Sequence, residues 1–253
     1  MAKSSSAFSR AGFSPIILLG FFLLIFIGDT LHLFEHQELG LVDLRFRLRP
    51  PRMPHSDIVV VEIDDQSINR IGHWPWPRSY HATLLTLLSE YKPRIVLYDV
   101  LFTEASLQPQ DDELFAYSLK KAGNVILAFF FQTVKPFTAF FPIPLFREAS
   151  NYVGYVNISP DIDARIRRIR LRVNPGQETY YHTSAVAALS RFKEPEEKEA
   201  WLKRIPLDSE KSFWVNYPGR FSLFKRIPFS EIVEEHEKGD ERLKNIFEGK
   251  VVI

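Results

Sequence analysis

The chain reads IVVVEIDD at residues 58–65, IVLYDVLF at residues 95–102 and VILAFFF at residues 125–131. Continuous apolar and β-branched runs of this length are typical of strands buried on both faces of a parallel sheet. A helical pattern with an apolar stripe that includes Leu84 and Leu88 separates the first two runs. Strands that alternate with helices predict right-handed βαβ units, with these three strands side by side. The sequence therefore predicts an α/β fold with a mostly parallel sheet and flanking helices.

The remaining segments predict a more varied architecture. Residues 152–158 and 166–173 have the composition of strands and predict a smaller, mixed β region. Residues 137–146 are rich in proline and phenylalanine and predict an irregular, lid-like loop. Residues 251–253 begin a further buried strand. In residues 39–52 arginines alternate with apolar residues, which predicts an exposed connecting strand or a juxtamembrane arm.

Carboxylates follow the first two predicted strands. Asp64 and Asp65 end the first strand, Asp99 lies in the second run, and Glu104 comes soon after it. Ligands of such sheets usually bind beyond the carboxyl ends of the strands. Neighbouring carboxylates have the chemistry to bind a hard cation through oxygen ligands, or to hold a proton through mutual repulsion. The alternative is structural, because aspartates at strand ends also cap loops by accepting backbone hydrogen bonds.

A tryptophan–proline block, WPWPR at residues 74–78, lies between the same two strands. Each proline fixes its own φ and restricts the residue before it, so the block is expected to be stiff and extended. It presents Trp74, Trp76 and Arg78 near the carboxylates, as in an aromatic-walled ligand site. The alternative is a rigid loop whose tryptophans cover the sheet edge and whose arginine pairs with a nearby aspartate.

The composition excludes several classes of function. The chain has 253 residues, a net charge of +1 and no cysteine. It therefore has no disulfide, no thiolate metal site and no cysteine nucleophile, and no overall field that favours nucleic acid. It also lacks a His-Glu-x-x-His motif, a phosphate-binding loop and a Gly-x-Ser-x-Gly elbow. The sequence predicts no catalytic residues, no metal site and no cofactor.

The N-terminal segment predicts attachment to a membrane. Residues 1–12 are small and polar and are expected to form a cytoplasmic tail. Residues 13–34 form an apolar run of about the length that crosses a bilayer, roughly 20 residues. Lys3 and Arg10 precede the run, so the N-terminus is expected inside the cell and the rest of the chain outside. We expect an uncleaved, single-pass transmembrane signal anchor in the inner membrane, with a periplasmic main domain.

Several motifs together resemble a known family, the type-two CHASE domain. The first motifs are DLRFR at 43–47, VVVEIDDQS at 59–67, GHWPWPR at 72–78 and YDVLF at 98–102. The later ones are GYVN at 154–157, NYPG at 216–219 and FEGKVVI at 247–253. The similarity covers residues 40–253, and its most specific part is the pair of aspartates followed by the tryptophan–proline block. At Ala164, after Asp163, members of the family often have glycine.

The resemblance implies an extracytoplasmic sensory domain, of the kind associated with bacterial adenylate or diguanylate cyclases, histidine kinases of two-component systems and Ser/Thr kinases. These output domains normally lie in the cytoplasm, and in the sequence they come after further transmembrane helices. We expect residues 40–253 to be such a sensor, truncated at its C-terminus, with the output domain missing from the chain. The resemblance supplies no catalytic residues.

The predicted function is therefore that of a membrane-anchored sensor of a small-molecule or protein cue, and not of an enzyme. Expected partners are the membrane and the cue but no nucleic acid, and a homodimer is left open. Two alternatives stay open: an envelope metal-dependent hydrolase that uses Asp64, Asp65 and Asp99, and a periplasmic scaffold without a ligand. The predicted ligand or signalling edge consists of Asp64, Asp65, Trp74, Trp76, Arg78, Asp99 and Glu104.

Overall fold

A computed structural model gives the structure of residues 15–30, 33–132, 138–175, 178–238 and 242–253. The chain divides into two compact units, Met1–Pro50 and Pro51–Ile253. The first unit contains helices α1 and α2, and the second contains every strand of the described residues.

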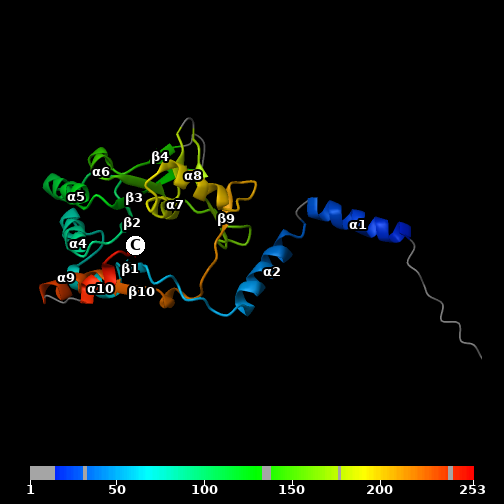
Figure 1. The fold of residues 1–253 in the computed structure, drawn as a ribbon, viewed down its shortest axis with the longest axis horizontal. Helices are drawn as coiled ribbons and strands as arrows, with labels where there is room; N and C mark the ends of the chain where they lie inside the picture. The colour runs from blue at the N-terminus through cyan, green and yellow to red at the C-terminus, as the bar shows by residue number, and fades with distance from the viewer. Residues whose placement is uncertain (1–14, 31–32, 133–137, 176–177, 239–241) are drawn as a thin grey trace, which may run out of the picture. The chain divides into compact units, whose positions relative to one another are not determined.

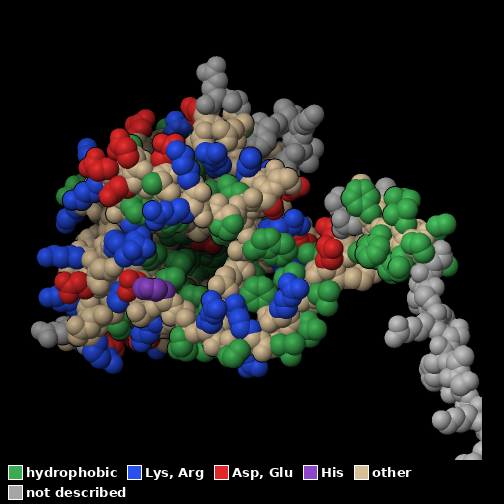
Figure 2. Space-filling view, turned by 45° about the vertical axis from the view of Figure 1, so that its right-hand side comes forward, with side chains coloured by type: hydrophobic (Ala, Val, Ile, Leu, Met, Phe, Trp, Pro, Cys, Tyr) green, Lys and Arg blue, Asp and Glu red, His purple; other side chains and the backbone are tan. Residues whose placement is uncertain are grey.

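The first helix, α1 (Pro15–Thr30), is apolar from its start to Gly28. Its large hydrophobic side chains are exposed, and Figure 2 shows them gathered around the helix. Over the ranges that the structure describes, no helix has the length and apolar character needed to cross a membrane. The predicted transmembrane anchor over residues 13–34 is therefore not confirmed. Four of its residues, 13, 14, 31 and 32, lie outside the described ranges.

The second helix is α2 (Glu35–Leu48). It covers most of residues 39–52, where the sequence predicts an exposed connecting strand, so the prediction of a strand is wrong. The alternation of arginine with apolar residues at every second position has the period of a strand, but a run of three arginines is too short to determine the backbone conformation. Here the helix is favoured by its glutamates, leucines and arginines, all good helix formers. Two glutamates lie in its first turn and two arginines in its last turn, where their charges complement the helix dipole.

The second unit contains eight α-helices, one 3₁₀ helix and eleven strands in its described residues. The helices are α3 (Asp65–Ile71), α4 (Arg78–Glu90), α5 (Pro109–Ala122), α6 (Pro144–Ala149), α7 (Thr183–Leu189), α8 (Pro195–Arg204), η1 (Phe221–Leu223), α9 (Phe229–Glu237) and α10 (Arg242–Phe247). The strands are β1 (Ile58–Glu62), β2 (Ile95–Leu101), β3 (Val125–Gln132), β4 (Thr138–Phe140), β5 (Tyr152–Tyr155), β6 (Arg168–Arg170), β7 (Arg172–Val173), β8 (Tyr180–Tyr181), β9 (Ser212–Trp214), β10 (Lys225–Pro228) and β11 (Val251–Val252).

Seven of these strands form the main sheet of the described chain. Their order is β10-β1-β11-β2-β3-β4, with β5 also paired to β3. Every pair is parallel except β3 with β4, which confirms the predicted α/β fold with a mostly parallel sheet. The prediction that the first three strands are direct neighbours is wrong at one point, because β11 lies between β1 and β2. An interior position removes more of the apolar surface of β11 from water than an edge position does.

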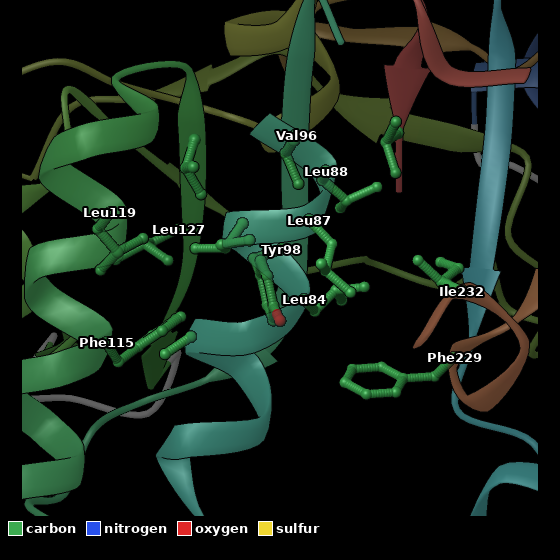
Figure 3. Packing of buried hydrophobic residues seen from close by; sticks show 14 of the residues in the cluster. Leu84, Leu87, Leu88, Val96, Tyr98, Phe115, Leu119, Leu127, Phe229 and Ile232 are labelled. Carbon is green, nitrogen blue, oxygen red and sulfur yellow. The ribbon is translucent and has the colours of Figure 1, made fainter. Parts of the chain in front are cut away.

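Helices cover both faces of this sheet. Helices α4, α5 and α9 lie on one face and α7 lies against the other, as Figure 1 shows. The main core fills the space between the sheet and the first group of helices. In Figure 3, Leu84 of α4 and Phe115 of α5 point toward the strands, while Phe229 of α9 lies on the opposite side of the cluster. Burial of each such side chain contributes about 1.5–3 kcal/mol.

The smaller β region differs from its prediction. Residues 152–158 give β5, which joins the main sheet, so they are not part of the separate mixed region as predicted. Residues 166–173 form β6 and β7, which pair antiparallel with β9 and β8 in two small sheets. The predicted lid-like loop over residues 137–146 instead contains β4 and the start of α6, and its residue 137 lies outside the described ranges.

Glycine at position 154 allows β5 to lie directly against α7. A Cβ atom added to Gly154 would lie 2.7 Å from the Cα of Thr183, closer than real Cβ contacts come. A larger residue would therefore force β5 away from the helix or distort the strand. The close packing of β5 against α7 therefore explains why the GYVN motif has glycine at position 154.

A buried charge cluster holds the loop before β6. The Arg167 guanidinium donates to Asp161 Oδ2 at 2.9 Å and to Asp163 Oδ2 at 2.6 Å. Arg168 donates to the second oxygen of Asp161 at 2.6 Å. The hydrogen bonds from Arg167 hold the pKa of Asp163 well below its ordinary value. Because Arg167 and Asp161 are both buried, this cluster is part of the fold and not a solvated cationic surface.

The turn inside this cluster has a strained residue. Ala164 has a φ of 62°, in the left-handed region where a Cβ atom is unfavourable. We expect Ala164→Gly to stabilise the protein by about 1 kcal/mol, because glycine adopts this conformation without the steric cost. Thermal unfolding measures this as a rise of roughly 2–4 °C.

The control for this substitution is Ala187→Gly, within α7, where the same change costs stability because glycine is a poor helix former. A fall of the unfolding temperature in both variants would contradict the strain at position 164.

Candidate functional site

A cavity of about 670 Å³ lies where β2 ends. Two connecting segments form its walls: residues 72–77, between α3 and α4, and residues 102–108, between β2 and α5. Its lining includes five of the seven predicted site residues, Trp74, Trp76, Arg78, Asp99 and Glu104, and we call it the Trp74 cavity. This is the position expected for a ligand site in a parallel sheet, beyond the carboxyl end of a strand.

The tryptophan–proline block forms one wall of the Trp74 cavity. It follows Gly72, whose φ of 116° is open to glycine but not to ordinary side chains. Trp76 is buried, donates its indole N–H to the Gly72 carbonyl at 2.8 Å, and packs on Phe229. Trp74 stands edge-on to Trp76 at 5.4 Å and stays 39% exposed. Trp76 therefore anchors the block, and Trp74 offers an accessible aromatic surface to a ligand.

Arg78 supplies the positive charge of the cavity. Its guanidinium lies 4.6 Å from the centre of the Phe102 ring, and one N–H donates to the Glu104 carbonyl at 3.4 Å. Its Nε is 3.7 Å from Asp112 Oδ1, and neither of these two buried atoms has a hydrogen-bond partner in the described chain. Burial lowers the pKa of the Arg78 guanidinium, and the Asp112 carboxylate opposes that shift. The two groups are thus held together by charge at a distance longer than a hydrogen bond, and Arg78 is a residue of the cavity lining.

Three carboxylates also belong to the lining. Asp99 and Glu104 are exposed at the cavity, and Asp111 accepts a hydrogen bond from the Ser79 hydroxyl at 3.2 Å. Their three negative charges outweigh the single charge of Arg78 among the lining residues. An aromatic surface beside several carboxylates and one guanidinium suits a small molecule with cationic or hydroxyl groups.

Asp64 and Asp65 do not line this cavity. Asp64 is the N-cap of α3, where its Oδ1 accepts the Ser67 backbone N–H at 2.8 Å. Burial acts to raise the pKa of Asp64, but the hydrogen bonds from Ser67 and nearby backbone hold it below its ordinary value. Asp65 is the exposed first residue of the same helix. The geometry therefore gives Asp64 the role of a helix cap, which was the structural alternative to ligand binding. Neither Asp64 nor Asp65 belongs to the lining of the Trp74 cavity, which contains the other five predicted site residues.

Sequence reasoning missed a buried histidine behind the cavity. His81, on α4, is fully buried, and its Nδ1 lies 3.1 Å from the Tyr98 hydroxyl. Its ring also packs edge-on against Trp74 at 5.7 Å. Burial, with the nearby Arg78 charge, lowers the pKa of His81 to about 4. The signal was available, because His81 lies three residues before Leu84, on the apolar face of the predicted helix.

In the ranges that the structure covers, no group of three or more histidines and carboxylates is arranged to hold a metal ion. The paired carboxylates predicted for the first two strands do not converge, since Asp64 is committed to its cap and Asp99 lines the cavity.

The comparison with protein families gives one match. A family model described as the CHASE2 domain matches residues 16–253. No curated protein and no solved structure matches the chain.

Proposed function

The chain belongs to the CHASE2 domain family, a family of extracellular sensory domains, and from this premise we propose that it is the cue-binding part of a bacterial membrane receptor. Its cue binds in the Trp74 cavity. The observation that carries the proposal is that one cavity at the carboxyl end of β2 gathers an accessible tryptophan, an arginine and several carboxylates.

We propose further that the N-terminal segment attaches the domain to the membrane, with the domain on the extracytoplasmic side. The exposed hydrophobic side chains of α1 support this, because a surface of this kind is costly in water. The basic residues that precede it favour a cytoplasmic N-terminus. Fractionation of cells that express the full chain tests the proposal: the protein should stay with membranes after alkaline carbonate washing, and recovery in the wash would contradict membrane attachment.

The cavity proposal is tested by ligand binding. The purified protein is titrated with amino acids, polyamines and monosaccharides, which cover cationic and hydroxyl-rich small molecules, and binding is followed by calorimetry and by tryptophan fluorescence. Parallel titrations with Mg²⁺, Ca²⁺ and Mn²⁺ test the metal-dependent hydrolase alternative. Binding of a metal ion that Asp99→Ala abolishes, together with hydrolytic turnover, would favour the enzyme over the sensor.

For a ligand found in this way, Trp74→Ala is expected to weaken binding about 10-fold or more, equivalent to about 1.4 kcal/mol, since the aromatic surface is lost. The matched control is Trp214→Ala, which removes another half-exposed tryptophan that does not line the Trp74 cavity. Equal losses in the two variants, or no loss in either, would place the ligand elsewhere.

A further inference from the structure

We propose that a basic and aromatic surface of the second unit docks on an anionic lipid bilayer. The surface consists of residues 51–53 and 217–226, and we call it the bilayer patch. The inference rests on the proposed membrane attachment for its argument of reach. It adds a second contact with lipid, made by the sensory domain itself, and it applies to either side of the membrane.

The bilayer patch joins two segments that lie far apart in the sequence. The Arg52 amide donates to the Pro218 carbonyl at 2.8 Å. Gly219 lies next to Pro51, because a Cβ atom added to the glycine would be 3.6 Å from the Cβ of the proline. In Figure 1 the orange segment before β10 lies beside the light-blue segment that leads to β1. The two segments therefore form one continuous surface.

Positive charge is concentrated in the bilayer patch. It contains no acidic residue, and its four cations are exposed: Arg52, Arg220, Lys225 and Arg226. Arg226 pairs with Glu62 at 3.1 Å, whereas the other three cations form no ion pair with any residue that the structure describes. The whole chain has a net charge of +1, so this is a local excess. Such a surface attracts phosphate groups, whose geometry the guanidinium group matches with paired hydrogen bonds.

Large apolar side chains stand exposed among these cations. Met53 is 77% exposed, Phe221 56% and Tyr217 43%. Phe221 lies 5.9 Å from Phe224 between ring centres, and the Arg226 guanidinium is 5.4 Å from the centre of the Phe221 ring. Exposed apolar surface rimmed by charge marks an interaction site, and tyrosine rings are enriched at the headgroup level of membranes.

The mixture of the two kinds of side chain selects a lipid surface as the partner. Cations and apolar rings alternate along residues 217–226, so a partner must offer anionic and apolar groups at every point of contact. A bilayer with anionic lipids does so over its whole area, because charged headgroups lie directly above the acyl chains. Arginine and lysine stems can lie along the apolar part while their charged ends stay at the headgroups.

The place of the bilayer patch in the chain favours the same partner. Pro51, the first residue of the second unit, belongs to it. Among the described residues, α2 is the one element between α1 and Pro51, and a helix of its length spans about 21 Å. A chain held in the membrane by α1 therefore keeps the patch within reach of the bilayer surface.

The test uses the full chain in lipid vesicles. Because the chain has no cysteine, Ser222→Cys places a single environment-sensitive fluorophore at an exposed position of the patch. Tyr117→Cys carries the same label on α5, at a side chain that is 66% exposed, as the control position. In vesicles that contain phosphatidylglycerol, brominated acyl chains should quench the label at position 222 and not the label at position 117. Phosphatidylcholine vesicles or added salt should weaken this quenching, since the attraction between charges is removed or screened.

Removal of charge gives the size of the effect. Arg220→Gln and Lys225→Gln should each lower the ratio of docked to undocked patch about 5-fold, since one basic residue near an anionic surface contributes this much to binding. The matched control is Lys120→Gln with Lys121→Gln, which removes two exposed charges from the end of α5 and should leave the ratio unchanged. Equal losses in the two pairs would overturn the proposal, because net charge and not the patch would then determine docking.

Retention of the chain on the vesicles after carbonate washing reports the proposed attachment separately. Retention without quenching at position 222 would overturn the bilayer patch and leave the attachment standing. Salt-sensitive quenching before the wash, followed by loss of the chain in the wash, would overturn the attachment alone and support the patch. Equal shielding of the label in detergent micelles without anionic lipid, together with dimer formation, would overturn the proposal, because a second copy would then cover the patch.

Discussion

Lowering the pH from 6.5 to 4 is expected to destabilise the second unit by about 3 kcal/mol for each of two buried histidines. His81 and His182 both have a pKa lowered to about 4 by burial, and for His81 the Arg78 charge adds to the effect. The unfolded chain binds protons at the ordinary histidine pKa of 6.5, above the pKa of the folded state. The stability that the neutral histidines contribute is therefore complete above pH 6.5 and is lost as the pH falls through 4.

Urea unfolding between pH 7 and pH 4.5 measures this effect as the slope of the unfolding free energy against pH. The variants His81→Gln and His182→Asn should each reduce that slope by about one proton, even where the substitution itself changes the stability at pH 7. A slope that is the same in the protein and in both variants would assign the acid sensitivity to carboxylates instead.

Replacing Arg167 with methionine is the substitution expected to cost the most stability, about 3–5 kcal/mol. The change leaves Asp161, whose side chain is 2% exposed, with Arg168 as its remaining partner in the cluster. The loss should appear as a fall of roughly 10 °C in the unfolding temperature. Methionine keeps much of the length of the arginine side chain, so the measurement reports the charge and its hydrogen bonds more than the packing.

The neighbouring Arg165 provides a matched control. Its side chain is 54% exposed and lies 3.9 Å from Asp163, an arrangement that contributes less than about 1 kcal/mol. Arg165→Met should therefore leave the unfolding temperature almost unchanged. Similar losses for the two arginines would show that burial of the cluster does not determine its contribution.

The parallel sheet could be predicted from the sequence because burial on both faces leaves a local signature, the continuous apolar run. The position of β11 between β1 and β2 has no such signature. Which strands become neighbours depends on contacts between segments far apart in the chain, and every apolar run is locally compatible with several neighbours. The helix at residues 35–48 was missed for a related reason, since a short alternating run has the period of a strand while helix propensity and contacts elsewhere decide the backbone conformation.

For the candidate site, the sequence located the right loops but not the division of roles among their residues. Trp74 and Trp76 have the same local context, yet one is buried against Phe229 and the other is half-exposed. Asp64 and Asp99 both follow apolar runs, but Asp64 is turned to the start of α3 by its bond with Ser67. Such choices depend on the three-dimensional surroundings of each side chain, which one sequence does not encode locally.

The two sheet neighbours of β1 come late in the sequence, and this affects how the chain folds. β1 is made early in synthesis, but both of its neighbours, β10 and β11, come from the last thirty residues, and Arg226 pairs with Glu62 across 164 positions. Contacts of this separation slow folding, since a long loop must close before they form. The nascent chain therefore carries a hydrophobic strand without its sheet neighbours for most of its emergence, and intermediates of this kind are prone to aggregation.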